Sequence, residues 1–456
     1  MIDTNHHRDR VLPSLAARRR SLFWRIHFWS ALIASPFALI AALTGILYIF
    51  TPQIEQVLYA KLDHVQASGQ MRPLDAAIDA ARLATPTDSS LRSVVPALAS
   101  TDSIKVFFML PALHATHAPT DEHGAHHAPA TKAASNPRSA VIYVDPYTTA
   151  ILGMHMDNDR FSTWSKKLHS NLLQGDGWRW MIELAASWLM VMLLTGIYLW
   201  RPRKNESGLP QRGAKDRKWW TQWHGFIGVV LSIMSLVILT TGLTWSKYAG
   251  DQVRWARDSV GQATPQAPRN LTSTVIDGIA PMTWQAAADA ARRQAPEIAL
   301  QLAAPRDHLG TWRVNNYDRS QPQKRVDMVL DAYSGKALFY SGWNDQTAFS
   351  KATGIGIPFH RGEFGCWNQL LLLIFGLGIV FSLLSGWIMF FKRRKAGSFG
   401  LPKLLPGAWK SIPTGAWISA AVMFMLMPLL AWSAAVLAII EMILHFATRK
   451  ISKLTF

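Results

Sequence analysis

Two histidines open apolar stretches of this chain with the same spacing. His27 begins a run that ends in Thr44-Gly45, and His224 begins one that ends in Thr241-Gly242. In both runs the glycine comes 18 residues after the histidine. A neutral imidazole is the usual axial ligand of haem iron and a common ligand of other transition metals. A histidine among Trp and Arg at a membrane surface can also be a simple interfacial anchor.

A second pair of histidines precedes two further apolar stretches. His169 lies in "KKLHSNLLQGDGW", 27 residues before the glycine of Thr195-Gly196. His360 lies in "GIPFHRGEFGCW", 26 residues before the glycine of Ser385-Gly386. The basic runs "LWRPRK" and "FFKRRK" follow these dipeptides. Matching histidines, spacings and flanking charges indicate that the chain is an internal duplication.

The elements that carry these histidines are apolar runs long enough to cross a bilayer. The chain has 456 residues, of which 49% are hydrophobic, and it contains 47 Lys and Arg. The apolar residues gather in runs of roughly 20 residues or more, about the length of a membrane-spanning helix. These runs cover 28–50, 181–200, 225–245, 370–391 and 414–446. The pattern predicts a polytopic α-helical membrane protein with two soluble inserts.

The net charge of +18 is gathered beside the apolar runs. Six Arg lie in 1–25, seven Lys or Arg in 201–218, and six in 392–410. Cytoplasmic loops are enriched in Lys and Arg, so these three segments are expected on the cytoplasmic side of the membrane. The same clustering argues against nucleic acid as a partner. The two long inserts are then expected on the opposite side, outside the cytoplasm.

The chain divides accordingly along its length. The expected segments are a cytoplasmic N-terminus 1–23, a first span 24–50, a periplasmic module 51–165, an outer histidine segment with the second span 166–200, a basic loop 201–218, a third span 219–247, a second periplasmic module 248–359, an outer histidine segment with the fourth span 360–391, a basic loop 392–413, a fifth span 414–446 and a basic tail 447–456. Pro428 leaves the fifth span open as one kinked helix or a hairpin.

The two inserts repeat as well. Residues 73–86, "PLDAAIDAARLATP", correspond to 282–296, "MTWQAAADAARRQAP", and both predict an amphipathic helix. Residues 140–153, "AVIYVDPYTTAILG", correspond to 326–339, "VDMVLDAYSGKALF", and both predict two strands joined by a turn. Each insert is therefore expected to be a small α+β module with a helix packed on an antiparallel sheet.

The topology places His27 and His224 near the inner face and His169 and His360 near the outer face. One histidine from each of two helices can hold a haem between them, so the four predict two haem b sites. Arg25 and Arg361 are candidate partners for haem propionates, as are Lys166 and Lys167. Zinc is a poorer match, because two histidines without nearby paired carboxylates or Cys fall short of its usual ligand set.

Three other features of the sequence say less about function. The loop 114–127, "HATHAPTDEHGAHH", is a His-rich segment that either binds metal weakly or is a low-complexity insertion. Cys366 is the only cysteine, which excludes intramolecular disulfides. The chain shows no G-x-G-x-x-G or P-loop motif, so no nicotinamide site is predicted.

Taken together, "LFWRIHFWSALIASPFALIAALTGILYIF", "WHGFIGVVLSIMSLVILTTGLTW" and the hairpins "VDPYTTAILG" and "LDAYSGKALF" resemble the PepSY-associated transmembrane family. This family includes iron-regulated inner-membrane proteins and ferric-siderophore reductases similar to the ferrioxamine B reductase. The resemblance implies an inner-membrane haem protein, an oxidoreductase that passes electrons to a periplasmic ferric siderophore or other ferric chelate and so releases Fe(II) for iron uptake. It implies a separate electron donor, either quinol or a cytoplasmic reductase.

Two other functions compete with electron transfer. In one, PepSY-like modules sense or bind a periplasmic peptide or protease, and the histidines are only anchors. In the other, the chain is a siderophore or metal permease. The permease is disfavoured because the apolar runs show no polar or broken stretch of the kind that transporters use.

Overall fold

The computed structural model describes residues 13–111, 138–156, 159–201 and 208–454, so the His-rich loop 114–127 lies outside the described residues. The chain forms two compact units. A helical unit consists of Met1–Ile49, Lys166–Ala263 and Phe359–Phe456. A sheet unit consists of Phe50–Ser165 and Thr264–Pro358.

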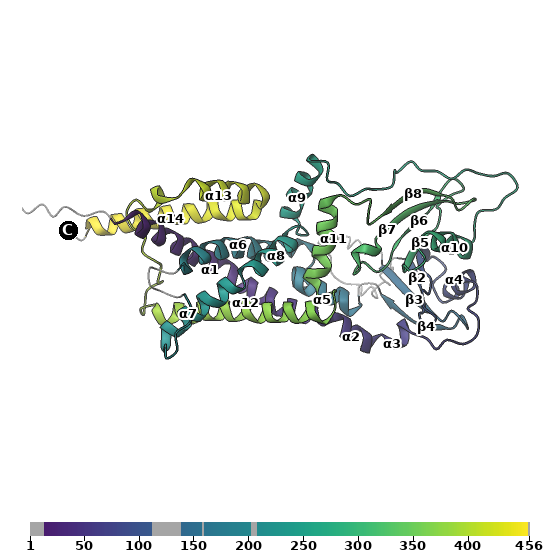
Figure 1. Ribbon diagram of the computed structural model, residues 1–456, viewed down its shortest axis with the longest axis horizontal. Helices are drawn as coiled ribbons and strands as arrows, with labels where there is room; N and C mark the ends of the chain where they lie inside the picture. Colours follow the sequence, from purple (N-terminus) through teal and green to yellow (C-terminus); the bar gives the residue numbers. More distant parts are fainter. Residues whose placement is uncertain (1–12, 112–137, 157–158, 202–207, 455–456) are drawn as a thin grey trace, which may run out of the picture. The chain divides into compact units, whose positions relative to one another are not determined.

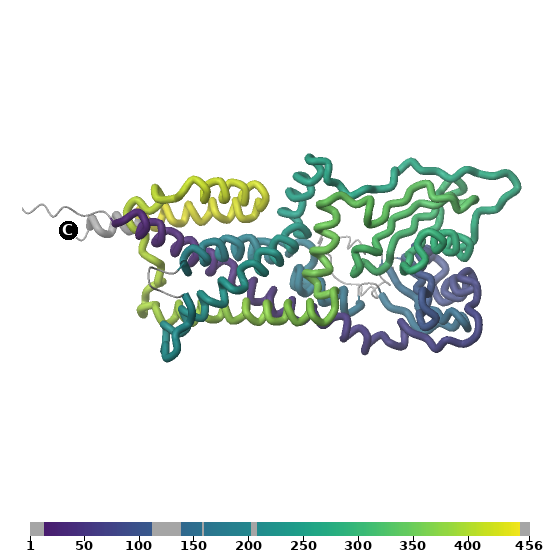
Figure 2. Tube along the Cα trace, in the orientation of Figure 1, coloured from purple at the N-terminus to yellow at the C-terminus, as the bar shows by residue number. Residues whose placement is uncertain are grey.

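The helical unit is built from long apolar helices. In the described part of the chain, four helices are long and apolar enough to cross a membrane, or five if one bent pair counts as a single span. The four lie within α1 (Leu15–Ile49), α6 (Arg179–Trp200), α12 (Cys366–Arg393) and α14 (Pro428–Leu454). Helix α1 packs against both α6 and α12, and Figure 2 follows the chain through this unit. The prediction of a polytopic membrane protein is supported.

The third span is broken. Helices α7 (Asp216–Val230) and α8 (Ser232–Leu243) meet at Leu231 with a bend of 57°. The Ser232 hydroxyl donates to the Val229 carbonyl at 2.6 Å, which satisfies one backbone group at the break. The expectation that the apolar helices are unbroken is therefore wrong for this span.

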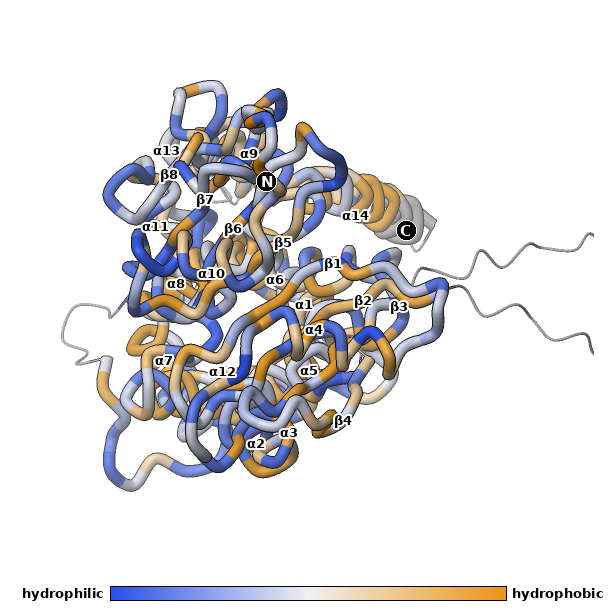
Figure 3. The backbone as a smooth tube through the Cα atoms, turned by 90° about the vertical axis from the view of Figure 1, so that its right-hand side faces the viewer, coloured by the Kyte–Doolittle hydropathy of each residue, from blue (hydrophilic) through white to orange (hydrophobic). Residues whose placement is uncertain are grey.

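The fifth span is a hairpin. Helix α13 (Thr414–Leu426) and α14 are joined at Met427 and lie side by side in Figure 1. Apolar residues run along α14 (Figure 3). The hairpin docks on α6 through a hydrogen bond from Trp188 Nε1 to Ser433 Oγ at 2.9 Å. Proline lacks an N–H and suits the first position of a helix, so Pro428 starts α14 and does not kink one long helix.

Two carboxylates of the described apolar helices, the buried Glu183 and the half-buried Glu441, both serve the packing. Glu183 accepts the backbone N–H groups of Tyr248 and Ala249 at 2.9 and 2.7 Å, which caps α9 (Tyr248–Ser259). Glu441 of α14 accepts two bonds from the Arg25 guanidinium of α1, at 2.8 and 2.7 Å. Each carboxylate is thus paired with a donor from another element.

A layer of apolar side chains crosses the middle of the helical unit. Its buried members are Ala38, Leu189, Leu239, Ile379 and Leu383. They come from α1, α6, α8 and α12, so the layer joins both halves of the helical unit. We call these five residues the apolar layer.

The sheet unit contains one antiparallel sheet. Its strands are β1 (Ser90–Val95), β2 (Ile104–Leu110), β3 (Arg138–Val144), β4 (Ile151–Met156), β5 (Leu300–Ala303), β6 (Thr311–Asn316), β7 (Val326–Asp331) and β8 (Ala337–Gly342). The order is β4-β3-β2-β1-β5-β6-β7-β8. Strand β1 pairs with β5 where Val94 faces Leu302, so the two inserts share one sheet rather than forming separate modules.

Two helices cover one face of this sheet and cap each other. Helices α4 (Leu74–Leu83) and α10 (Trp284–Gln294) lie next to one another in Figure 1 over a single hydrophobic core. The Asp75 carboxylate accepts the backbone N–H groups of Trp284 and Gln285, both at 3.0 Å. In return the Gln285 side chain accepts the N–H of Leu74 at 2.9 Å. Each insert thus completes the helix start of the other.

A cluster of charges lies below the first half of the sheet, near α2 (Thr51–Leu58) and α3 (Ala60–Asp63). Arg160 pairs with Asp63 at 2.6 Å and donates to the Tyr143 hydroxyl at 2.8 Å. Lys105 lies 3.0 Å from the other Asp63 oxygen. Burial alone would raise the pKa of Asp63, but the two cations outweigh it and hold this pKa below its ordinary value.

Candidate functional site

The inner histidines face each other. His27 comes from α1 and His224 from α7, and their ring centroids are 6.4 Å apart with the rings nearly perpendicular, at 89°. A metal ion bonds an imidazole nitrogen at about 2 Å, and the ring centre lies roughly 1 Å beyond that nitrogen. Two imidazoles on opposite sides of one metal therefore have centroids about 6 Å apart. The observed spacing matches that geometry.

The Nδ1 atoms of both inner rings are held by a neighbouring helix. His27 Nδ1 lies 3.0 Å from the Met192 carbonyl and 3.2 Å from Thr195 Oγ1, both on α6. His224 Nδ1 lies 3.0 Å from the Ser382 carbonyl and 2.9 Å from Ser385 Oγ, both on α12. Because Nδ1 makes these bonds, Nε2 is the nitrogen that each ring can offer to a metal.

The outer histidines repeat this arrangement. His169 ends α5 (Phe161–Asn171), and its Nδ1 lies 3.0 Å from Thr44 Oγ1 of α1. His360 ends α11 (Ala348–Arg361), and its Nδ1 lies 3.0 Å from Thr241 Oγ1 of α8. The short helices α5 and α11 each precede a spanning helix, which agrees with the predicted position of His169 and His360 just before a span.

A glycine beside each hydroxyl makes room for the ring. A Cβ added to Gly196 would lie 3.2 Å from His27 Cε1, and one added to Gly386 would lie 3.7 Å from His224 Cε1. The outer rings lie 3.4 Å from a Cβ on Gly45 and 3.3 Å from one on Gly242. The four Thr/Ser-Gly dipeptides therefore seat the four histidines.

From the sequence alone, these dipeptides are only markers of spacing. Each lies on the partner helix of its own half of the chain: Thr195-Gly196 seats His27, while Thr44-Gly45 seats His169. Each half of the chain contains two histidines and two dipeptides. This equal number is the signal that could have revealed which dipeptide contacts which histidine.

The inner pair borders a cavity of ≈ 1030 Å³. This volume lies near the upper end of the range of roughly 300–1,000 Å³ for cofactor and ligand pockets. Ala31, Gly225 and Gly228 line it, and a Cβ added to Gly228 would meet open space. The cavity has room for a planar macrocycle between the two rings, so the residues fit haem b.

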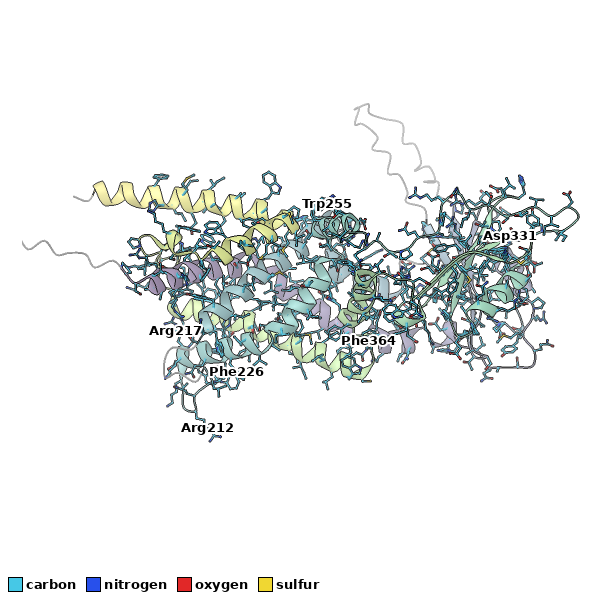
Figure 4. The ribbon with its side chains drawn as sticks, turned by 45° about the horizontal axis from the view of Figure 1, so that its top comes forward. Arg212, Arg217, Phe226, Trp255, Asp331 and Phe364 are labelled. Atoms are coloured by element: carbon cyan, nitrogen blue, oxygen red, sulfur yellow. The ribbon has the colours of Figure 1, made fainter. Side chains whose placement is uncertain are left out.

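Cations surround the inner cavity. The basic side chains that line it are Arg20, Arg217, Lys218, Arg393 and Lys403. Figure 4 labels Arg217 and Arg212 at one end of the helical unit and Phe364 at the other. Arg25 is not among the described residues that line the cavity, because its guanidinium is bound to Glu441. Arg361, beside the outer pair, donates to the Tyr48 hydroxyl at 3.0 Å and pairs with Glu363 at 2.7 Å.

The cavity wall also carries two hydroxyls with unused bonding capacity. In the described structure, Ser235 Oγ and Ser382 Oγ are buried without a hydrogen-bond partner, and both residues line the cavity. Buried polar atoms usually have partners, so a bound group or water is expected to reach them.

The described residues contain no group of three or more His, Cys, Asp or Glu that could hold a metal ion. A bare metal between His27 and His224 would therefore have only two protein ligands. A porphyrin supplies four more, which is the reason the geometry favours haem over zinc.

Comparison with protein families finds one that covers most of the chain. The family model described as "PepSY-associated TM region" matches residues 24–393. This range includes all four histidines and both inserts. Comparison with curated proteins finds no match.

Proposed function

Because this chain belongs to the PepSY-associated TM family, we propose that it is a transmembrane electron carrier that holds haem b at two bis-histidine sites. The observation that carries the proposal is the inner pair, whose rings lie 6.4 Å apart beside a cavity large enough for the cofactor. His27 and His224 are the inner ligands, and His169 and His360 are the outer ligands.

The residues around each site have separate tasks. The Nε2 atoms of each pair are presented to a shared metal, while the basic side chains at the inner cavity neutralise carboxylates that enter it. Arg361 is the corresponding candidate at the outer site. When bound, haem b supplies a one-electron carrier at each position. No protein nucleophile or acid is required for that chemistry.

Helix α1 sets the distance between the two sites. His27 belongs to the inner site, and Thr44 seats an outer ligand, so 17 helical positions separate them. At 1.5 Å per residue, this is about 25 Å along the helix. The two sites thus lie toward opposite ends of the helical unit, as a path across a membrane requires.

The reaction proposed for the outer end is the reduction of a ferric chelate, such as a ferric siderophore. One electron from a separate donor, quinol or a cytoplasmic reductase, converts Fe(III) to Fe(II). The lower charge weakens hard-oxygen coordination and releases the iron. We place the protein in a bacterial inner membrane with its N-terminus in the cytoplasm and its sheet unit in the periplasm, in line with the basic segments.

The test is an absorption spectrum of the full-length protein in detergent, before and after dithionite. We expect the Soret and α bands of haem b, and about half of this haem to be lost in the His27→Ala variant. The matched control is His155→Ala, because His155 lies on β4 against the Tyr59 ring. A colourless wild-type protein would contradict the proposal and favour a non-redox carrier of PepSY-like modules.

A further inference from the structure

We infer that the four Thr/Ser-Gly dipeptides are positioning residues that fix which nitrogen of each histidine carries the proton. Each hydroxyl holds the proton on Nδ1, and this keeps the lone pair of Nε2 directed away from the dipeptide for a metal. We call Thr44-Gly45, Thr195-Gly196, Thr241-Gly242 and Ser385-Gly386 the hydroxyl-glycine seats. The inference rests on the proposed function for the identity of the metal group, but not for the tautomer itself.

The hydroxyl hydrogen in each inner seat is already used within its own helix. Thr195 Oγ1 donates to the Val191 carbonyl at 2.8 Å, and Ser385 Oγ donates to the Ser382 carbonyl at 2.9 Å. A hydroxyl has one hydrogen, so its oxygen can only accept from the histidine. The Met192 carbonyl beside His27 is likewise only an acceptor. Both neighbours of His27 Nδ1 therefore require an N–H at that position.

The outer seats have the same bonds. Thr44 Oγ1 donates to the Ile40 carbonyl at 2.8 Å, and Thr241 Oγ1 donates to the Val237 carbonyl at 2.9 Å. Each hydroxyl is thus left as an acceptor for His169 or His360. The hydrogen bond made by one ring nitrogen decides the state of the other, so all four histidines are held in one tautomer.

The seats also explain why glycine follows each hydroxyl. The imidazole carbon Cε1 lies between the two ring nitrogens, and it is the atom nearest to a Cβ added at all four glycines. At Gly196 and Gly242, where the distance is 3.2 and 3.3 Å, a side chain would push Cε1 away and lengthen the bond from Nδ1 to the hydroxyl. The hydroxyl keeps the proton on Nδ1, and the glycine lets the ring come close enough to form this hydrogen bond.

Each seat serves only one site. Helix α1 carries the inner ligand His27 and the seat for the outer ligand His169, while α6 carries the seat for His27. In the second half of the chain, α7 carries the inner ligand His224, and α12 carries its seat. Helix α8 carries the seat for the outer ligand His360. A change in one seat is therefore expected to alter one haem and leave the other unchanged, which a general loss of packing would not do.

The decisive variant is Thr195→Val, which keeps the shape of the side chain and removes the hydroxyl, compared with Thr195→Ser, which keeps the hydroxyl. In the purified full-length protein, we expect Thr195→Val to lower the affinity of the inner haem roughly tenfold. Its midpoint potential should rise, because a weaker bond at Nδ1 makes Nε2 a poorer electron donor. Thr195→Ser should resemble the wild type.

The corresponding variant at the outer site is Thr44→Val, which should change the affinity and midpoint potential of the outer haem alone. The inference is overturned if Thr195→Val leaves the affinity and potential of the inner haem unchanged, or if both haems change together in either variant.

A second readout needs no haem. In full-length protein labelled with ¹⁵N-histidine and stripped of cofactor, nitrogen chemical shifts should show His27 with a protonated Nδ1 and a bare Nε2. Thr195→Val should raise the population of the tautomer with its proton on Nε2, because it removes one of the two acceptors of the Nδ1 proton and leaves the Met192 carbonyl alone to hold it. A wild-type His27 with its proton on Nε2 would refute the inference. A protein that binds no haem would refute the proposed function while this measurement still tested the seat.

Discussion

Gly196 shows how closely each histidine is fitted to its partner helix. Its position leaves only 3.2 Å between an added Cβ and the His27 ring, which is less than ordinary van der Waals contact. Gly386 holds the equivalent place beside His224, with 3.7 Å, and has space for a methyl group. These two glycines have the same role in the inner site, but they differ in how large a side chain the structure can accept in their place.

The Gly196→Ala variant is expected to weaken binding of the inner haem roughly tenfold, because the added methyl displaces the His27 ring. Gly386→Ala is the matched control and should change the affinity less than twofold. Both substitutions add alanine to a helix, so both raise helix propensity to a similar degree. Titration of haem into the stripped protein measures the difference. Equal losses in the two variants would contradict the structure.

The sequence predicted these residues unevenly. His27, His224, His169 and His360 were recognisable because they recur with matched spacing beside apolar runs. The basic residues around the inner cavity, such as Arg217 and Arg393, were not, because a positive cytoplasmic loop looks the same whether or not its side chains face a cavity. Arg25, which the sequence offers as a propionate partner, is ion-paired with Glu441 of the folded hairpin.

At the scale of elements, length and hydropathy predicted the spans, but local geometry did not follow from them. The break between α7 and α8 has no proline, so nothing in the pattern marked Leu231. Helices α5 and α11 are short and only partly apolar, and the sequence treated them as segments before a span. The sequence predicted only the hairpins at 140–153 and 326–339, and the pairing of β1 with β5 was not predicted because it joins residues about two hundred positions apart.

The charge cluster below the sheet predicts how the stability of the sheet unit depends on pH. The pKa of Asp63 is lowered in the fold from its ordinary 3.8, so its ion pairs stabilise the native state above that pH. This stability is lost as the pH falls through the depressed pKa, where the carboxylate gains a proton. Asp63→Asn should cost about 1–3 kcal/mol near neutral pH, since Lys105 loses its carboxylate partner while Arg160 keeps Glu55 at 3.2 Å.

Hydrogen exchange of the peptides that contain β2 and β3, measured on the intact protein, tests this prediction. The difference in hydrogen-exchange protection between the wild type and Asp63→Asn should become smaller below about pH 4. Asp79→Asn serves as the control, because Asp79 makes only an exposed pair with Arg82 on α4. A constant gap at all pH values would show that the loss comes from packing and not from charge.

At the scale of the whole molecule, the proposed function requires both histidine pairs to work in series. Proteoliposomes with a membrane-impermeant reductant on the side of the N-terminus should produce Fe(II) from a ferric chelate on the opposite side. His169→Ala should still allow the inner haem to be reduced, but Fe(II) formation should fall at least tenfold, because the outer carrier is lost. Fe(II) formation at the wild-type rate in this variant would contradict a two-site path, and His155→Ala should leave the rate unchanged.

The apolar layer has an electrical consequence. Ala38, Leu189, Leu239, Ile379 and Leu383 separate the inner and outer pairs within their own helices, and none of them can carry a proton. Of the two carboxylates in the described apolar helices, Glu183 caps α9 and Glu441 is ion-paired with Arg25. In the proposed path, an electron that crosses this layer would travel without a proton carried by these five side chains. Each turnover would be a small outward current of negative charge, and the resting voltage of a bacterial membrane, negative inside, would drive iron reduction forward.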